Sequence, residues 1–245
     1  MATNASKENV DLLLTDRAEV GFTQADIAGE RDKTAPGQLA ALARIYDDYV
    51  HLVVAGTGPI RTLADLRGKR VSVGSAGSGT AVTAGYILDV AGLVNSVDQR
   101  QLNLDESVVA LKAGGIDAFF FSGGLPVGAI ATLARTFPIK LLDLDTLVLS
   151  MRAKYGAYYA ERVVPASAYQ GIGPAVAIGI ANYLVVRVTM PEPLAFGVTR
   201  LLFEGRDELA KAHQAAARLN IRSAISTPPL PLHPGAIRYY RAQKA

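Results

Sequence analysis

Short apolar and β-branched runs alternate along this chain with segments whose apolar residues recur at helical spacing. The runs at 18–26, 43–56, 69–75 and 175–190 predict strands. Residues 80–92 predict a helix that stops at Gly92, and residues 107–124 predict a helix, a glycine break and a strand. Further along, the pattern predicts a helix over 128–136, a strand over 139–145, two helices within 191–219 and a short amphipathic helix within 231–243. This alternation is typical of an α/β fold.

Two extended segments, 49–69 and 175–190, resemble crossings between two lobes of such a fold. We therefore expect a two-lobed architecture with a double hinge, in which residues 1–57 and 179–245 form lobe 1 and residues 58–178 form lobe 2. Ligands of two-lobed proteins bind in the cleft between the lobes, so that is where we expect a site.

The composition removes several classes of chemistry. The 25 Lys and Arg residues against 22 Asp and Glu leave a net charge of +3 without a run of five like charges, which argues against a nucleic-acid partner. The absence of Cys excludes disulfides and thiolate chemistry, and the three His residues lack the spacing of a zinc site. No apolar stretch is long enough to span a bilayer. We expect neither a metal nor a cofactor.

The glycine-rich stretch GSAGSGT (74–80) lies between a predicted strand and a predicted helix. The first amides of a helix lack intrahelical acceptors and the helix dipole is positive there, so the turn suits an anion. Ser78, Gly79 and Thr80 are the candidate ligand residues. Neither GxxxxGK[ST] nor GxGxxG is present, which argues against a nucleotide. The alternative is that Ser78 only caps the helix.

A second turn, FFFSGGLPVG (119–128), again places small residues after a predicted strand, and Ser122 and Gly123 are candidates there. The alternative is a plain strand-to-helix turn. Phe119, Phe120 and Phe121 are expected in the core.

Three further candidates lie outside the glycine turns. Gln24 follows a predicted strand and offers an amide, and Asp26 either binds a ligand ammonium or caps the next helix. Tyr169 offers a phenol able to close over a ligand, the alternative being a surface tyrosine in a loop.

An α/β enzyme is the competing class, but no catalytic set assembles. The turn lacks a GxSxG pattern, and the three His residues, His51, His213 and His233, are expected at the surface or as helix caps. Asp143 and Asp145 alternate along a predicted strand, which favours a solvated strand end over an acid–base pair.

Five stretches taken together resemble the TAXI family of solute-binding proteins of TRAP transporters. They occur in the family's order and are SKENVDLLLTDRAEVGFTQADIA, LADLRGKRVSVGSAGSGTAV, GGIDAFFFSGGLP, VVPASAYQGIGPAVAIGIANYLVVR and PLHPGAIRYYRAQ. The resemblance implies a type II periplasmic-binding-protein fold, a periplasmic location and a monomer that is not an enzyme. It also implies capture of a small carboxylate such as glutamate, glutamine or a related dicarboxylate or oxo acid, and delivery to the TRAP membrane permease subunits.

Carried over residue by residue, the resemblance implies that Ser78, Gly79 and Thr80 line the ligand pocket, with Gln24, Asp26, Ser122, Gly123 and Tyr169 contributing. Ala25 replaces a hydroxyl residue of the family pattern, which bears on ligand choice.

The resemblance is weakest at the N-terminus. Family members carry a signal peptide, a strand and a glycine–tyrosine turn before an ATGGSxEN stretch, whereas Met1 here is followed almost at once by ATNASKEN. The resemblance therefore implies a lobe 1 that lacks its first strand. A third hypothesis follows, in which the chain is a truncated remnant of a receptor without function.

Overall fold

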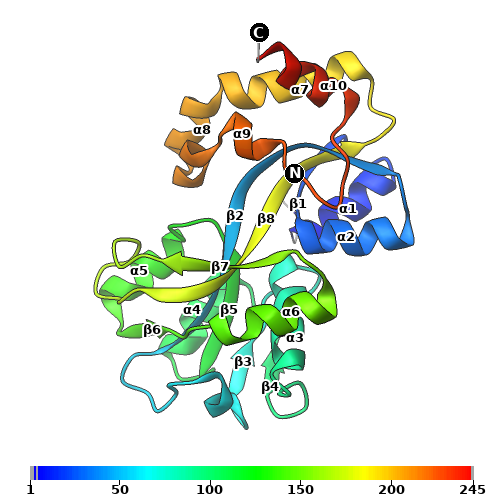
Figure 1. Ribbon diagram of the computed structural model, residues 1–245. Helices are drawn as coiled ribbons and strands as arrows, with labels where there is room; N and C mark the ends of the chain where they lie inside the picture. The colour runs from blue at the N-terminus through cyan, green and yellow to red at the C-terminus, as the bar shows by residue number, and fades with distance from the viewer. Residues whose placement is uncertain (1–2, 4, 244–245) are drawn as a thin grey trace. The chain divides into compact units, whose positions relative to one another are not determined.

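The computed structural model describes residue 3 and residues 5–243, and it divides into two compact units (Figure 1). Unit 1 comprises Met1–Asp47 and Ala181–Ala245, and unit 2 comprises Asp48–Ile180. Both divisions fall inside long strands, β2 (Leu39–Ala55) and β8 (Ala175–Arg187), so each of these strands belongs to both units. The sequence placed the divisions after residues 57 and 178, and residues 1, 2, 4, 244 and 245 of the expected lobe 1 lie outside the described residues.

Unit 1 combines a small antiparallel sheet with helices. Strand β1 (Val20–Gln24) pairs with the end of β8, with Phe22 opposite Leu184. The helices of this unit are α1 (Ser6–Leu14), α2 (Ala25–Thr34), α7 (Glu192–Glu204), α8 (Arg206–Ala212), α9 (Ile221–Ala224) and α10 (Pro234–Ala242), with a 3-10 turn at Gln214–Arg218. Helices α7 and α10 lie side by side (Figure 1).

The core of unit 1 lies between β2, β8 and the C-terminal helices. Leu42 and Val186 are fully buried there against Ala195, Tyr239 and Tyr240. The Tyr240 hydroxyl donates a 2.8 Å hydrogen bond to the carbonyl oxygen of Leu42. This bond satisfies a phenol that burial would otherwise leave without a partner, so it ties α10 to the strand.

Unit 2 is built on a mixed sheet. Its strands are β3 (Arg70–Ser72), β4 (Asp98–Arg100), β5 (Ala118–Gly123), β6 (Ile139–Leu141) and β7 (Tyr159–Val164), together with the adjoining parts of β2 and β8. Its helices are α3 (Gly79–Val90), α4 (Leu104–Lys112), α5 (Gly128–Thr136) and α6 (Val148–Tyr155), with 3-10 turns at Leu63–Leu66 and Asp145–Leu147.

Strand order in unit 2 places two glycine turns at one edge of the sheet. Strand β3 is parallel to both β4 and β5, whereas β2 is antiparallel to β5 and β6. Because parallel strands end at the same edge, the turns that follow β3 and β5 begin next to one another. The core beneath them includes Val53, Phe119 and Ile130, all with no exposed surface.

The sequence predicted most of these elements, with one error that affects a candidate pair. Strand β6 ends at Leu141. Beyond its end, the Asp143 carboxylate accepts a 2.7 Å hydrogen bond from the backbone amide of Val176. Asp145 begins a 3-10 turn instead. The expectation that Asp143 and Asp145 alternate along one strand is therefore wrong. Helices α1, α6 and α9 and strands β4 and β7 were not predicted.

Candidate functional site

The turn from β3 into α3 is organised by Ser78. Its Oγ accepts a 3.1 Å hydrogen bond from the amide of Ala81, as an N-cap residue does, and donates at 2.7 Å to the carbonyl oxygen of Ser75. The predicted capping role is confirmed. Since the single hydroxyl proton is used inside the turn, the Ser78 side chain shapes the turn and has no donor left for a ligand.

Three amides of the same turn remain available. In the described part of the chain, the backbone N–H groups of Gly77, Gly79 and Thr80 have no hydrogen-bond acceptor. They lie at the N-terminus of a 12-residue helix, where the helix dipole adds positive potential. Gly77 is exposed, whereas Gly79 and Thr80 are buried, so Gly77 is the residue of the three that solvent reaches.

The two glycine turns meet at Thr80. Its Oγ1 accepts a 3.2 Å hydrogen bond from the amide of Ser122, which lies at the end of β5. Thr80 is only 8% exposed, and none of the described residues accepts its hydroxyl proton. The Ser122 amide therefore fixes the oxygen while the O–H stays free to donate. Two segments that the sequence singled out separately thus meet in one polar cluster, which consists of the three amides and the Thr80 hydroxyl and which we call the Thr80 cluster.

Gly74 allows Thr80 to sit this close to the end of β3. Its φ is +97°, a backbone region that residues with a Cβ rarely adopt. A Cβ at this position would lie 2.8 Å from Cγ2 of Thr80 and 3.2 Å from Oγ of Ser78. Gly77 also has a positive φ, of +75°, but a Cβ there would meet nothing within 4 Å. Gly74 is required by close packing, and Gly77 only by its backbone conformation.

The second turn adjoins the Thr80 cluster through Ser122. Ser122 and Gly123 pair across the sheet with Val50 and Tyr49 of β2 and are partly exposed. A Cβ at Gly123 would lie 2.7 Å from the ring of Phe121, so this glycine also serves local packing. Phe119 and Phe120 are buried in the core, as predicted, and Phe121 packs against the same cluster.

Tyr169 lies inside unit 2 and is only 2% exposed. Its hydroxyl oxygen is 2.9 Å from Nε2 of His51 and accepts a 3.1 Å hydrogen bond from the amide of Val127. Burial raises the pKa of Tyr169 to about 12, so the phenol stays protonated. The expectation of a surface tyrosine is wrong. The phenol, expected to close over a ligand, instead uses its hydrogen-bonding groups within the unit.

His51 is a residue whose place the sequence analysis missed. It was expected at the surface or as a cap, but it is 1% exposed within β2, and desolvation lowers its pKa to about 4. The apolar run VHLVV was the available signal, because a strand that is apolar on both faces is buried on both faces. His213 and His233 do cap helical turns, accepting from the amides of Ala215 and Gly235.

Gln24 and Asp26 lie in unit 1, at the junction of β1 and α2. Both are buried, at 2% and 4% exposed. The backbone N–H of Gln24 donates a 3.2 Å hydrogen bond to Oγ of Ser6. Oδ1 of Asp26 accepts a 2.8 Å hydrogen bond from the backbone N–H of Ile27. Asp26 thus supports the first turn of α2, and a role for either side chain toward a ligand stays a prediction.

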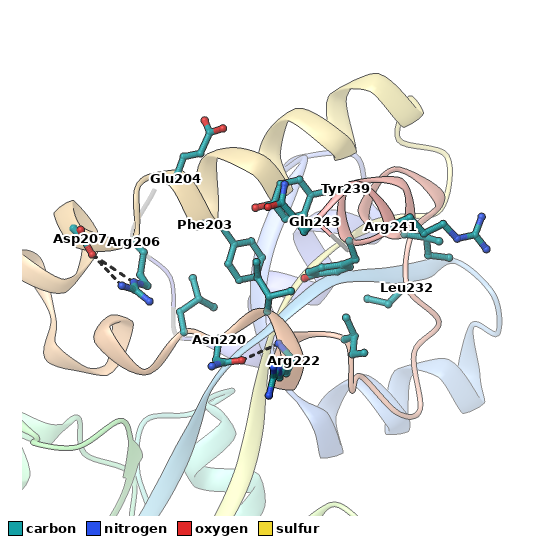
Figure 2. Close-up of a pocket in the computed structure, with 15 residues that line it drawn as sticks. Phe203, Glu204, Arg206, Asp207, Asn220, Arg222, Leu232, Tyr239, Arg241 and Gln243 are labelled. Atoms are coloured by element: carbon teal, nitrogen blue, oxygen red, sulfur yellow. Dashed lines mark hydrogen bonds and ion pairs between the residues drawn. The ribbon is translucent and has the colours of Figure 1, made fainter. Parts of the chain in front are cut away.

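Unit 1 also contains a hollow of about 1070 Å³ among its C-terminal helices (Figure 2). Its lining includes apolar and aromatic side chains such as Phe203 and Tyr240, together with charged ones such as Arg206 and Arg241. Asp207 pairs with Arg206 at 3.4 Å, and Arg241 extends away at the other side (Figure 2). Its lining carries both signs of charge, with Glu204 and Asp207 as well as Arg206 and Arg222, so the Thr80 cluster with its unpaired amides is the better candidate for an anionic solute.

Two features are absent from the part of the chain that the structure describes, a metal-ligand cluster and a membrane-spanning helix. No group of three or more His, Asp or Glu side chains is arranged to hold a metal ion among those residues. Within the same residues, no helix combines the length and the apolar character that a bilayer crossing requires.

Comparison with solved structures identifies the fold. The chain is similar to the periplasmic aliphatic sulphonate binding protein SsuA from Escherichia coli, at 16% identity over 98% of this chain and 70% of that chain, with a TM-score of 0.55. It is also similar to a putative L-cystine ABC transporter protein from Listeria monocytogenes, at 16% identity over 87% of this chain and 77% of that chain, with a TM-score of 0.56.

A third similar structure is an amino acid ABC transporter substrate-binding protein from Streptococcus pneumoniae bound to L-arginine. It is 17% identical over 87% of this chain and 73% of that chain, with a TM-score of 0.52. These likenesses define a type II periplasmic-binding-protein fold, as the sequence predicted. The model of the NMT1-like family matches residues 1–243, and this chain belongs to that family.

Proposed function

We propose that this chain is the extracytoplasmic solute-binding receptor of a TRAP-type transporter and that it captures a small carboxylate. Membership of the NMT1-like family and the periplasmic-binding-protein fold support a receptor. The sequence resemblance to the TAXI family supports the TRAP type, with the membrane permease subunits as partners and a monomeric receptor. Glutamate, glutamine and related dicarboxylates or oxo acids are the proposed solutes.

The observation that carries the proposal is the Thr80 cluster at the start of α3. It offers the amides of Gly79 and Thr80 and the free hydroxyl proton of Thr80, all at one helix N-terminus. A carboxylate oxygen accepts such donors, and each charge-assisted hydrogen bond is stronger than a neutral one. No lysine lies in the turn, which favours a carboxylate over the outer phosphates of a nucleotide.

Two of the similar structures are of proteins that bind small charged molecules. One is described as binding aliphatic sulphonates, and another was solved with L-arginine. The proposed carboxylate is also a small charged molecule. Roles of Gln24 and Asp26 toward the solute are also part of the proposal, with Asp26 suited to the ammonium of an amino acid.

Calorimetric titration of the chain with L-glutamate, L-glutamine and 2-oxoglutarate tests the proposal, with 1,4-diaminobutane as a probe that lacks a carboxylate. We expect saturable binding of at least one acid, a rise in melting temperature with its concentration, and no effect of the diamine. The acid should be recovered unchanged after incubation, since a receptor binds without turnover. Absence of binding to all three acids, or their conversion, would contradict the proposal.

Thr80→Val locates the site. Valine keeps the shape of threonine but removes the hydroxyl, so we expect affinity for the acid to fall by about tenfold, equivalent to about 1.4 kcal/mol. Thr199→Val is the matched control, because Thr199 is fully buried in α7 and its hydroxyl donates to the carbonyl oxygen of Ala195. Equal affinities of the two variants would remove Thr80 from the site.

A further inference from the structure

His51, Tyr169 and Val127 form a continuous hydrogen-bonded chain inside unit 2. Nδ1 of His51 lies 2.8 Å from the carbonyl oxygen of Tyr49, and Nε2 lies 2.9 Å from the hydroxyl of Tyr169. The same hydroxyl is 3.1 Å from the amide nitrogen of Val127. This chain of hydrogen bonds therefore connects β2, the loop before β8 and the turn before α5.

The chemistry of its two ends fixes every proton in this chain. A carbonyl oxygen only accepts, so Nδ1 of His51 carries the proton and donates to Tyr49. Nε2 is then a lone pair, and the Tyr169 hydroxyl donates to it. The phenol oxygen in turn accepts from the Val127 amide, which only donates. His51, Tyr169 and Val127 are buried, Tyr49 is partly buried, and the backbone of Phe121, opposite His51 on β5, is a further hydrogen-bonding partner of the imidazole.

The segment held by this chain of hydrogen bonds is the turn that begins at Ser122, whose amide contacts the Thr80 cluster. Residues 122–127 contain two adjacent glycines, which leave the backbone free to adopt many conformations. At one end the turn is held by pairing of Ser122 and Gly123 with β2. At the other end, the Val127 amide is held by Tyr169.

We propose that His51 and Tyr169 are positioning residues of the Thr80 cluster. By holding Val127 they fix the turn, and the turn fixes the Ser122 amide that orients the Thr80 hydroxyl. This inference rests on the proposed function for its effect on ligand affinity. The coupling from Tyr169 to Ser122 is a property of the free protein and is measured without a ligand.

Tyr169→Phe tests the coupling, because it removes the hydroxyl and keeps the ring. In ¹H–¹⁵N spectra of the ligand-free chain, we expect faster hydrogen exchange of the Val127 amide and a shifted Ser122 amide resonance. Tyr240→Phe is the matched control, since it removes an equally buried tyrosine hydroxyl that donates to Leu42 in unit 1. It should leave both amides unchanged. An unshifted Ser122 resonance in Tyr169→Phe would overturn the proposal.

The histidine provides a rescue experiment. His51→Phe removes the acceptor of the Tyr169 proton and should reproduce the spectrum of Tyr169→Phe, whereas His51→Gln retains an acceptor oxygen and should restore the wild-type Ser122 resonance. Identical spectra of the two His51 variants would count against a positioning role. If the variants do not fold, the imidazole resonances of the wild type test the proton assignment. A proton on Nε2 of His51 would contradict the proposed chain of hydrogen bonds.

Affinity for L-glutamate or 2-oxoglutarate completes the test. We expect Tyr169→Phe to weaken binding by at least fivefold while Tyr240→Phe stays within twofold of the wild type. A Tyr169→Phe affinity within twofold of the wild type would refute the positioning role. If the wild type binds neither of these acids nor L-glutamine, the proposed function fails, and the ligand-free spectra still decide whether Tyr169 controls Ser122.

Discussion

The burial of His51 makes the stability of unit 2 depend on pH. Desolvation lowers its pKa from 6.5 to about 4, so the imidazole is neutral in the folded protein at neutral pH. Between these two pH values the unfolded chain binds a proton that the folded chain does not. The free energy of unfolding therefore falls as the pH falls from 6.5 toward 4, and it is unaffected by His51 above that window.

The size of the effect follows from the shift in pKa. A lowering of about 2.5 pKa units, at about 1.4 kcal/mol per unit, gives a loss of about 3 kcal/mol once the pH reaches 4. About 2 kcal/mol of this is already lost at pH 5. His51→Gln has no titrating group at this position, so its stability lacks this contribution at every pH.

The assay is urea unfolding of the wild type and of His51→Gln, followed by circular dichroism at pH 7.5, 6.0 and 5.0. Taking the difference between the two proteins at each pH cancels the carboxylates and the other two histidines. We expect this difference to change by about 2 kcal/mol between pH 7.5 and 5, with the wild type losing more. A difference that stays constant to within about 0.5 kcal/mol would show that His51 is not desolvated and would refute the reasoning.

Three further predictions concern local structure. Gly74→Ala should lower the free energy of unfolding by at least about 2 kcal/mol, because it combines a strained φ with a close contact against Thr80. Gly77→Ala should lower it by only about 1 kcal/mol, because only the φ is unfavourable there. Equal losses of the two variants in urea unfolding would contradict the packing argument. Ser78→Ala should lower stability by about 1 kcal/mol through loss of the cap, and an unchanged melting temperature would argue against it. A side-chain hydrogen bond from Arg70 holds the pKa of Asp117 below its usual value. The ion pair therefore stabilises the wild type at neutral pH, and this stabilisation is lost on acidification. Asp117→Asn should lower the free energy of unfolding at neutral pH by about 1 kcal/mol. The variant should then be less sensitive to pH below about 4, as acid-unfolding curves would reveal.

The α3 turn could be predicted because its features are local. A strand of apolar residues, glycines at the bend and a Ser at the N-cap lie within a few positions of one another, and helix capping depends on neighbours in the sequence. The alternation of strands and helices, and the fold class, follow from periodicity in the same way. The sequence also identified both glycine turns as candidates without any information on which turn faces which.

Only the tertiary structure decided how these residues work. Thr80 and Ser122 are 42 positions apart, and they meet because β3 and β5 are parallel neighbours, a pairing that no local pattern encodes. Tyr169 and His51 are 118 positions apart, and their hydrogen bond turns an expected ligand contact and an expected surface histidine into a buried pair. Hydrogen bonding and burial depend on which segments pack together. For that reason the residue types were readable from the chain, whereas their roles depended on partners that only folding brings within reach.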